Sequence, residues 1–233
     1  MTKLRVLGII PARGGSKGIP SKNIKALDGL PLIAYTIQSA LASDLKEVIV
    51  STDSIEIAEV AKRFGAKVPF FRPADLASDI ASSMPVAIHG LQEMEKINDC
   101  KYDAVMLLQP TTPFRKSEDI NSAIEILESR NSDSVISVVE VGGTHPARMK
   151  YMKEGLLIDP PFCEQKENQN RQELEPMYIR NGAIYLTKRE ILLKGTYKGE
   201  TCAALVMPST RSVNIDTIFD FEYAEWLKSS NKV

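Results

Sequence analysis

The sequence contains few of the residues that build disulfide frameworks, zinc sites or histidine-based catalytic centres. It has three cysteines, Cys100, Cys163 and Cys202, and two histidines among 233 residues. An odd number of widely spaced cysteines argues against a disulfide framework or a zinc site and is typical of a reducing compartment. We therefore expect a cytoplasmic protein whose chemistry does not depend on cysteine or histidine.

Two further classes of protein are disfavoured by what the chain lacks. Lysine and arginine number 29 against 30 aspartates and glutamates, so there is no basic excess of the kind that binds nucleic acid. No apolar run approaches the roughly 20 residues that span a membrane. The first residues, MTKLRVLGIIPARGG, contain only a short apolar stretch and read as mature sequence, not as a signal peptide. We expect a protein that binds neither nucleic acid nor membranes.

Apolar runs alternate with helical patterns along most of the chain. This alternation is typical of βαβ units and predicts an α/β fold with a mostly parallel sheet flanked by helices. A chain of this length can form one large domain. Strands are predicted at 4–10, 47–51, 103–109, 134–141, 181–187 and 203–207, and helices at about 31–41, 54–65, 84–94, 117–128 and 218–227.

The regular pattern is interrupted at about 142–178. This stretch is polar and carries Pro160 and Pro161 in its middle. A structureless loop of this length is uncommon in a compact domain unless it has a function. We expect an excursion that packs against a partner chain or acts as a lid.

The strongest candidate site is residues 8–23, GIIPARGGSKGIPSKN, which begin at the end of the first predicted strand and continue into a glycine-rich turn. Gly14, Gly15 and Gly18 allow positive φ angles and a close approach of the backbone to a ligand. Successive N–H groups in such a turn form a concavity that binds anions. The spacing matches neither the Walker A motif nor the dinucleotide-binding fingerprint. The stretch therefore predicts a polyphosphate site, with three cations at Arg13, Lys17 and Lys22.

Two other polar loops lie at corresponding places in the predicted fold. Residues 109–115 follow the strand at 103–109, and residues 214–217 follow the return from the strand at 203–207. Ligands of open α/β sheets bind beyond the carboxyl ends of the strands. We therefore expect the three loops to converge on one cleft, where a nucleotide, a second substrate and a carboxylate are neighbours.

Four motifs together resemble a known family. They are IIPARGGSKGIPSKN at 9–23, LQPTTPFR at 108–115, NGAIYL at 181–186 and NIDTIFDF at 214–221. The combination resembles the CMP-sialic acid synthetases (acylneuraminate cytidylyltransferases), with the relatives that activate legionaminic and pseudaminic acids. The resemblance spans essentially the whole chain. The Gly-Gly-Ser-Lys form of the first motif argues against the related CMP-Kdo synthetases.

The resemblance implies a reaction and an architecture. The anomeric hydroxyl of a nonulosonic acid would attack the α-phosphate of CTP, and CMP-sugar and pyrophosphate would form with Mg²⁺ as the required cofactor. Such a transfer needs positioning and charge neutralisation more than a dedicated nucleophile. The implied fold is a single Rossmann-like domain over residues 1–233, of the nucleotide-diphospho-sugar transferase type. Its excursion at 142–178 would form a homodimer and close over the sugar site of the other chain.

The resemblance also assigns residues to roles. Lys17, Arg13 and Asp216 would be catalytic, with Lys17 stabilising charge at the α-phosphate. The implied nucleotide-binding residues are Ala12, Arg13, Gly14, Gly15, Ser16, Lys17, Lys22, Asn23, Arg72 and Ser83. The implied sugar-binding residues are Gln109, Thr111, Thr112, Arg171, Asn181 and Tyr185. Asp216 would be the metal ligand; Asn214 stands where many members have a second aspartate and can offer only a carbonyl oxygen.

Three alternatives stay open at this point. The nonulosonic acid could be of the sialic, legionaminic or pseudaminic type, since those sugars differ in substituents that pocket shape reads. One or two metal ions could act, given Asn214. The chain could also be an inactive nucleotide-binding scaffold of the same fold, although the presence of Lys17 and Asp216 favours an enzyme.

Overall fold

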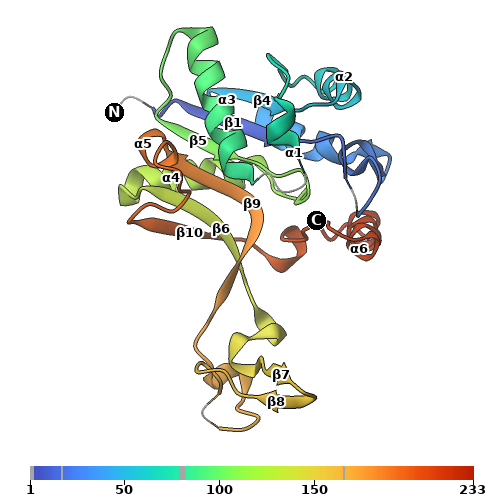
Figure 1. The fold of residues 1–233 in the computed structure, drawn as a ribbon, viewed down its shortest axis with the longest axis vertical. Coiled ribbons are helices and arrows are strands. Elements are labelled where there is room, and N and C mark those ends of the chain that lie inside the picture. The colour runs from blue at the N-terminus through green and yellow to red at the C-terminus, as the bar shows by residue number, and fades with distance from the viewer. Residues whose placement is uncertain (1–2, 17, 79–81, 165) are drawn as a thin grey trace.

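The computed structural model describes residues 3–16, 18–78, 82–164 and 166–233. It consists of an α/β body and a slender lobe that projects from it (Figure 1). The body is built on a six-stranded sheet. Across this sheet the strands are β10 (Cys202–Val206), β6 (Ser134–Glu140), β9 (Tyr178–Lys188), β5 (Ala104–Leu107), β1 (Val6–Pro11) and β4 (Glu47–Ser51).

The sheet is mostly parallel, as the alternation of strands and helices predicts, but it contains an antiparallel strand. β4, β1 and β5 are parallel to one another, and β10 is parallel to β6. β9 lies between β5 and β6 and is antiparallel to both. Its direction follows from the lobe: the chain leaves the body along β6 and returns along β9, so the two strands must run in opposite directions.

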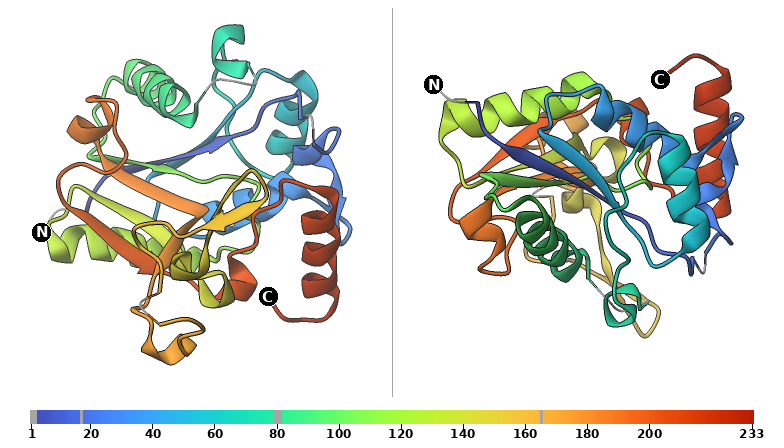
Figure 2. Two further views of the ribbon diagram at one scale, coloured as in Figure 1. Left: turned by 60° about the horizontal axis from the view of Figure 1, so that its bottom comes forward. Right: turned by 90° about the horizontal axis from the view of Figure 1, so that it is seen from above.

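Helices cover both faces of the sheet. Along β1, Val6 and Ile10 face one core, while Leu7 and Ile9 face another, as the two-residue period of a strand requires. The first core is closed by α1, α2 and α4, and the second by α3 and α5; Figure 2 shows α3 and α4 on opposite sides. The helices are α1 (Leu32–Leu41), α2 (Ile55–Arg63), α3 (Ser83–Asn98), α4 (Ser117–Arg130), α5 (Arg189–Leu192) and α6 (Ile218–Ser229).

The C-terminal helix α6 packs beside a small hairpin that sequence reasoning did not predict. This hairpin is formed by β2 (Ala26–Leu27) and β3 (Leu30–Pro31). Phe221 and Leu227 of α6 are buried with Leu27 and Leu32 in a third core. None of the helices described here is long and apolar enough to cross a membrane.

The segment predicted to interrupt the pattern forms the lobe, which we define as residues 141–177. β6 and β9 pair as far as Glu140 and Tyr178, which face each other where the lobe begins, with a bulge in β9 between Arg180 and Tyr185. Within the lobe lies a hairpin of β7 (Tyr151–Lys153) and β8 (Leu156–Ile158). Short 3₁₀ turns complete it at Gly142–Thr144, Pro146–Arg148 and Arg171–Glu173.

An ion pair fixes α3 against α5. Arg189 donates from Nε and Nη2 to the two carboxylate oxygens of Glu95, at 2.7 and 2.9 Å. The backbone N–H of Tyr102 also donates to Glu95. The hydrogen bonds from Arg189 lower the pKa of Glu95, and they outweigh the opposing effect of burial.

We expect Glu95→Gln to destabilise the fold by about 1–2 kcal/mol at pH 7, because one charge-assisted pair is lost. A carboxyl group with a lowered pKa stabilises the folded state above its unfolded pKa of about 4.3, and this contribution disappears as the pH falls through the folded value. Urea unfolding of the wild-type protein and of Glu95→Gln, at pH 7 and at pH 3, would measure the loss of stability and its dependence on pH. An equal difference between the two proteins at both pH values would contradict the expectation.

Candidate functional site

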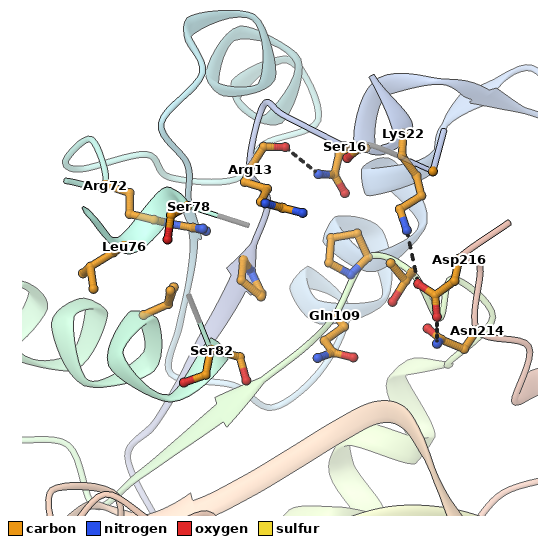
Figure 3. A pocket seen from close by; sticks show the side chains of 17 residues that line it. Arg13, Ser16, Lys22, Arg72, Leu76, Ser78, Ser82, Gln109, Asn214 and Asp216 are labelled. Carbon is orange, nitrogen blue, oxygen red and sulfur yellow. Dashed lines mark hydrogen bonds and ion pairs between the residues drawn. The ribbon is translucent and has the colours of Figure 1, made fainter. Parts of the chain in front are cut away.

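A cavity of about 530 Å³ opens at the carboxyl ends of β1 and β5 (Figure 3). Its size is in the range of about 300–1,000 Å³ that is usual for small-molecule sites. The three loops singled out in the sequence all contribute to its wall, so their predicted convergence is confirmed. The sequence-predicted residues that line it are Arg13, Ser16, Lys22, Asn23, Arg72, Ser83, Gln109, Thr111, Asn214 and Asp216.

The glycine loop is tied to its surroundings by the backbone. Gly14 donates its N–H to Asp53 Oδ1 at 3.0 Å, and Asn23 donates from Nδ2 to the carbonyl of Arg13 at 3.0 Å. A Cβ on Gly18 would lie 2.6 Å from the carbonyl oxygen of Asp216, a distance that side chains do not tolerate. Glycine is therefore required at position 18, where the first loop packs directly on the loop of residues 214–217.

The remaining predicted residues of this loop do not line the cavity. Ala12 is fully buried, and its N–H donates to the carbonyl of Ser51 at 3.0 Å. Gly14 and Gly15 belong to the turn itself and are not part of the cavity wall. Lys17, the predicted charge stabiliser, lies outside the described residues.

Arg72 and Ser83 form one end of the cavity. Arg72 is buried, and its Nε donates to Ser51 Oγ at 3.2 Å while Nη2 donates to the Ser51 carbonyl. Burial lowers the pKa of Arg72 to about 10, Asp53 opposes that change and Arg13 adds to it. The guanidinium stays protonated at neutral pH and forms a fixed positive charge in the wall. Ser83 accepts a hydrogen bond from the hydroxyl of Tyr197 at 3.2 Å.

The wall beside Gln109 depends on the Asn181-Gly182 pair. Thr112 is buried and donates to the Asn181 carbonyl at 3.1 Å, so its side chain supports the wall from behind. Asn181 is also buried, and its side chain bonds Ser137 and Ser212. Gly182 has φ +81°, and a Cβ there would lie 2.9 Å from Gln109 Oε1.

Gly182 was missed by sequence reasoning. An Asn-Gly dipeptide inside a predicted strand was the available signal, because glycine in a strand marks a bulge or a close backbone approach. Any larger residue would press on Gln109 and change the shape of this wall.

Two residues predicted for the sugar site lie elsewhere. Arg171 is in the lobe, where its Nη2 lies 3.4 Å from Glu140 Oε1. It lines a separate cavity with Glu140, Gly142 and His145. Tyr185, on β9, packs against Tyr197 with ring centroids 5.4 Å apart and is not part of the cleft wall.

Arg115 holds the floor of the cleft although it does not line it. This residue is buried and donates to the carbonyls of Ala183 (2.9 Å) and Gln109, and to Thr36 Oγ1 (2.7 Å). Burial lowers the pKa of Arg115 to about 9, and the nearby Asp119 opposes that change. The guanidinium therefore joins α1, β9 and the loop that carries Gln109.

Asp216 presents its carboxylate at the other end of the cavity. Lys22 Nζ lies 3.4 Å from Asp216 Oδ1 and donates to the Ile215 carbonyl at 2.7 Å. Asn214 donates from Nδ2 to Asp216 Oδ2 at 2.7 Å. The Ile215 N–H donates to the carbonyl of Thr111 at 2.8 Å, which joins this loop to the second one.

The donor set around Asp216 fits a metal ion only if a ligand supplies further oxygens. Among the described residues, no group of three or more histidines, cysteines, aspartates or glutamates is placed to hold a metal. Mg²⁺ is commonly bound through one or two carboxylates together with substrate phosphates and waters. Asp216, 65% exposed toward the cavity, and the carbonyl oxygen of Asn214 fit that arrangement.

The charges of the cleft suit an elongated polyanion. Arg72 and Lys22 lie toward opposite ends, with Arg13 between them (Figure 3). Cations fixed before a ligand arrives cost little reorganisation when negative charge develops on it. The arrangement can bind a phosphate chain along the cleft, beside the wall that contains Gln109.

Comparisons with known proteins agree with this geometry. The model of the family described as cytidylyltransferase matches residues 7–229. The chain is 38% identical over 235 aligned residues to the CMP-N,N'-diacetyllegionaminic acid synthase of Legionella pneumophila, with 98% of each chain covered. It is 35% identical over 231 aligned residues to the pseudaminic acid cytidylyltransferase of Campylobacter jejuni, again with 98% of each covered.

A solved structure shares the fold. CMP:2-keto-3-deoxy-manno-octonic acid synthetase complexed with CTP superimposes with a TM-score of 0.70 at 16% identity, over 97% of this chain and 99% of that one. At this identity the likeness concerns the fold alone. Because the family model covers nearly the whole chain and two full-length relatives exceed 30% identity, this chain belongs to the cytidylyltransferase family.

Proposed function

We propose that this protein transfers the cytidylyl group of CTP to the anomeric hydroxyl of a nonulosonic acid and releases pyrophosphate. The observation that carries the proposal is a single cleft in which the cations Arg13, Lys22 and Arg72 face the same cavity as Asp216. Relatives named for CMP-legionaminic acid synthesis and pseudaminic acid cytidylyl transfer support the class of sugar.

In this proposal the residues act by position and charge. Arg13 and Lys22 bind the phosphate chain, and Arg72 and Ser83 border the end of the cleft where the nucleoside lies. Gln109 and Thr111 face the incoming sugar. Mg²⁺, held by Asp216 and phosphate oxygens, would neutralise charge on the departing pyrophosphate.

For the sugar itself we favour a legionaminic or pseudaminic acid over N-acetylneuraminic acid. The support is that the two full-length relatives compared above are named for those sugars. The test is pyrophosphate release from CTP and Mg²⁺ with each of the three sugars in parallel, and with no sugar as the control. Fastest turnover with N-acetylneuraminic acid would overturn this preference.

The same assay separates the enzyme from an inactive scaffold. A scaffold would bind CTP, as calorimetry can measure, but release no pyrophosphate with any sugar. That result would remove the proposed activity and leave only the nucleotide site.

We further propose that the lobe pairs two copies of the chain. Its hairpin exposes apolar side chains that a lone chain would leave in water: Tyr151 (58%), Met152 (76%), Leu156 (71%) and Leu157 (72%). Contiguous exposed apolar surface is typical of an interface. Leu157→Asp is expected to give a monomer by light scattering. Lys153→Asp, which places the same acidic side chain on the hairpin without removing an apolar one, is expected to leave a dimer.

Pairing would also give Arg171 a role that it cannot have within its own chain. If Arg171 acts on the partner's cleft, a dimer of one Arg171→Ala chain and one Arg13→Ala chain has one complete site. That site combines the intact Arg13 of the first chain with the intact Arg171 of the second. We expect recovery of about a quarter of wild-type activity, because half the dimers are mixed and each has one intact site. Absence of recovery, with mixed dimers verified by mass spectrometry, would contradict action across the interface.

A further inference from the structure

Three side chains at one end of the cleft form what we call the carboxylate latch: Lys22, Asn214 and Asp216. Both carboxylate oxygens of Asp216 are engaged. Oδ1 lies 3.4 Å from Lys22 Nζ, and Oδ2 accepts from Asn214 Nδ2 at 2.7 Å. The dashed contacts in Figure 3 connect all three side chains.

The latch is held in place by the backbone around it. Lys22 is mostly enclosed, with a side chain 14% exposed, and donates to the Ile215 carbonyl at 2.7 Å. The N–H of Asp216 donates to Asp220 Oδ2 at 3.0 Å, and Thr217 donates to the same carboxylate. The backbone of Asp216 is thus anchored at the first turn of α6, next to the carbonyl of Ile215 that Lys22 also binds.

In the absence of nucleotide, the latch would bind a divalent cation weakly. Within the latch, the ammonium of Lys22 balances the carboxylate of Asp216. The neighbouring carboxylate of Asp220, whose pKa Lys22 also helps to lower, is already occupied by the N–H groups of Asp216 and Thr217. The cation would have to displace a like charge from Oδ1 and reverse the amide of Asn214, which now presents hydrogens instead of oxygen. Both changes cost free energy with no compensating ligand from the protein.

A triphosphate changes this balance. It offers Lys22 a partner of higher negative charge in the same cavity, lined also by Arg13 and Ser16. When Lys22 turns to a phosphate, Oδ1 of Asp216 is released at the point where phosphate oxygens can complete a cation's shell.

We propose that nucleotide binding opens the carboxylate latch and thereby creates the divalent-cation site, so that the free protein does not bind the cation by itself. This inference rests on the proposed function for the identity of the nucleotide. Asn214 makes the cation bind after the nucleotide. An aspartate at this position would give the latch a net charge of −1, which would attract the cation before any nucleotide arrives. Linkage requires that the cation strengthen nucleotide binding by the same factor.

The first experiment measures Mn²⁺ binding to the nucleotide-free protein by electron paramagnetic resonance of the unbound ion. Wild-type protein is expected to bind Mn²⁺ at least tenfold more weakly than Asn214→Asp. Asn214→Ala, which removes the amide without adding charge, is the matched control and is expected to stay within threefold of wild type. Equal Mn²⁺ affinity for wild type and Asn214→Asp would overturn the proposal.

A second variant is expected to change the affinities for Mn²⁺ and for CTP in opposite directions. Lys22→Met removes the ammonium but keeps the length of the side chain. We expect its Mn²⁺ affinity without nucleotide to rise at least tenfold, and its CTP affinity, measured by calorimetry in EDTA, to fall at least tenfold. A Lys22 that only binds phosphate would lower CTP affinity and leave Mn²⁺ affinity unchanged, which would also overturn the latch.

These measurements contain no sugar, so they are independent of turnover. If pyrophosphate release failed with every nonulosonic acid but the Mn²⁺ and CTP results held, the proposed function would fall and the latch would stand. Far-ultraviolet circular dichroism and thermal melting of each variant verify folding. Asn214→Asp keeps the proposal falsifiable if Lys22→Met does not fold.

Discussion

Arg13→Ala is expected to lower kcat with CTP by about 10²–10³-fold, because a positioned cation is lost from the middle of the cleft that is proposed to bind the phosphate chain. The backbone at this position is held independently of the side chain, since the Arg13 carbonyl accepts from Asn23 at 3.0 Å. The substitution leaves this backbone hydrogen bond in place. Steady-state pyrophosphate release, with kcat and KM determined separately, measures the effect.

The conservative variant gives the control for this prediction. Arg13→Lys keeps the charge but loses the planar fork of donors that suits phosphate oxygens, so we expect it to recover part of the lost rate. Thermal stability should be close to wild type in both variants. A change confined to KM, with kcat intact, would mean that Arg13 binds the nucleotide but does not stabilise the transition state.

The second large effect concerns stability. Arg115→Met is expected to reduce the free energy of unfolding by about 3–5 kcal/mol, because two buried carbonyls and Thr36 lose a charged donor. The acceptors belong to three separate parts of the body: Ala183 on β9, Gln109 after β5 and Thr36 on α1. Chemical denaturation at pH 7 measures the loss.

Arg115→Lys separates charge from geometry at this position. The single ammonium of lysine can bind some of the three acceptors. Arg115→Lys should therefore lower the free energy of unfolding clearly less than Arg115→Met does. CTP affinity should fall with stability in Arg115→Met, because Gln109 is then no longer held. Unchanged unfolding in Arg115→Met would show that the three acceptors are satisfied without the guanidinium.

Much of the body follows from local sequence patterns. Val6 and Ile10 alternate with Leu7 and Ile9, which is the pattern of a strand buried on both faces, and the structure places them in two cores. The convergence of the three loops was also predictable, since it depends only on the rule that parallel strands carry ligand loops at their carboxyl ends.

Other features depend on long-range pairing, which no local pattern records. The insertion of β9 between β5 and β6 is decided by where the returning chain finds partners. Arg171 lies in the lobe, within the excursion predicted at 142–178, but its contact with Glu140 also depends on this long-range return of the chain. The role of Arg115 could not be predicted from local sequence, because its acceptors Ala183 and Thr36 lie far apart in the chain and come together only in the fold.

The two strands that enter the lobe bear on how the length of this chain can change. Val138 faces Arg180 and Glu140 faces Tyr178, so the pairing is settled before the lobe begins. Residues added or lost between 141 and 177 would not shift that pairing. One extra residue in the regular part of β9 that pairs with β5, from Tyr185 to Lys188, would turn the following side chains to the wrong face. Insertions and deletions among homologues should therefore concentrate in the lobe, which can be remodelled for a new partner while the catalytic body keeps its register.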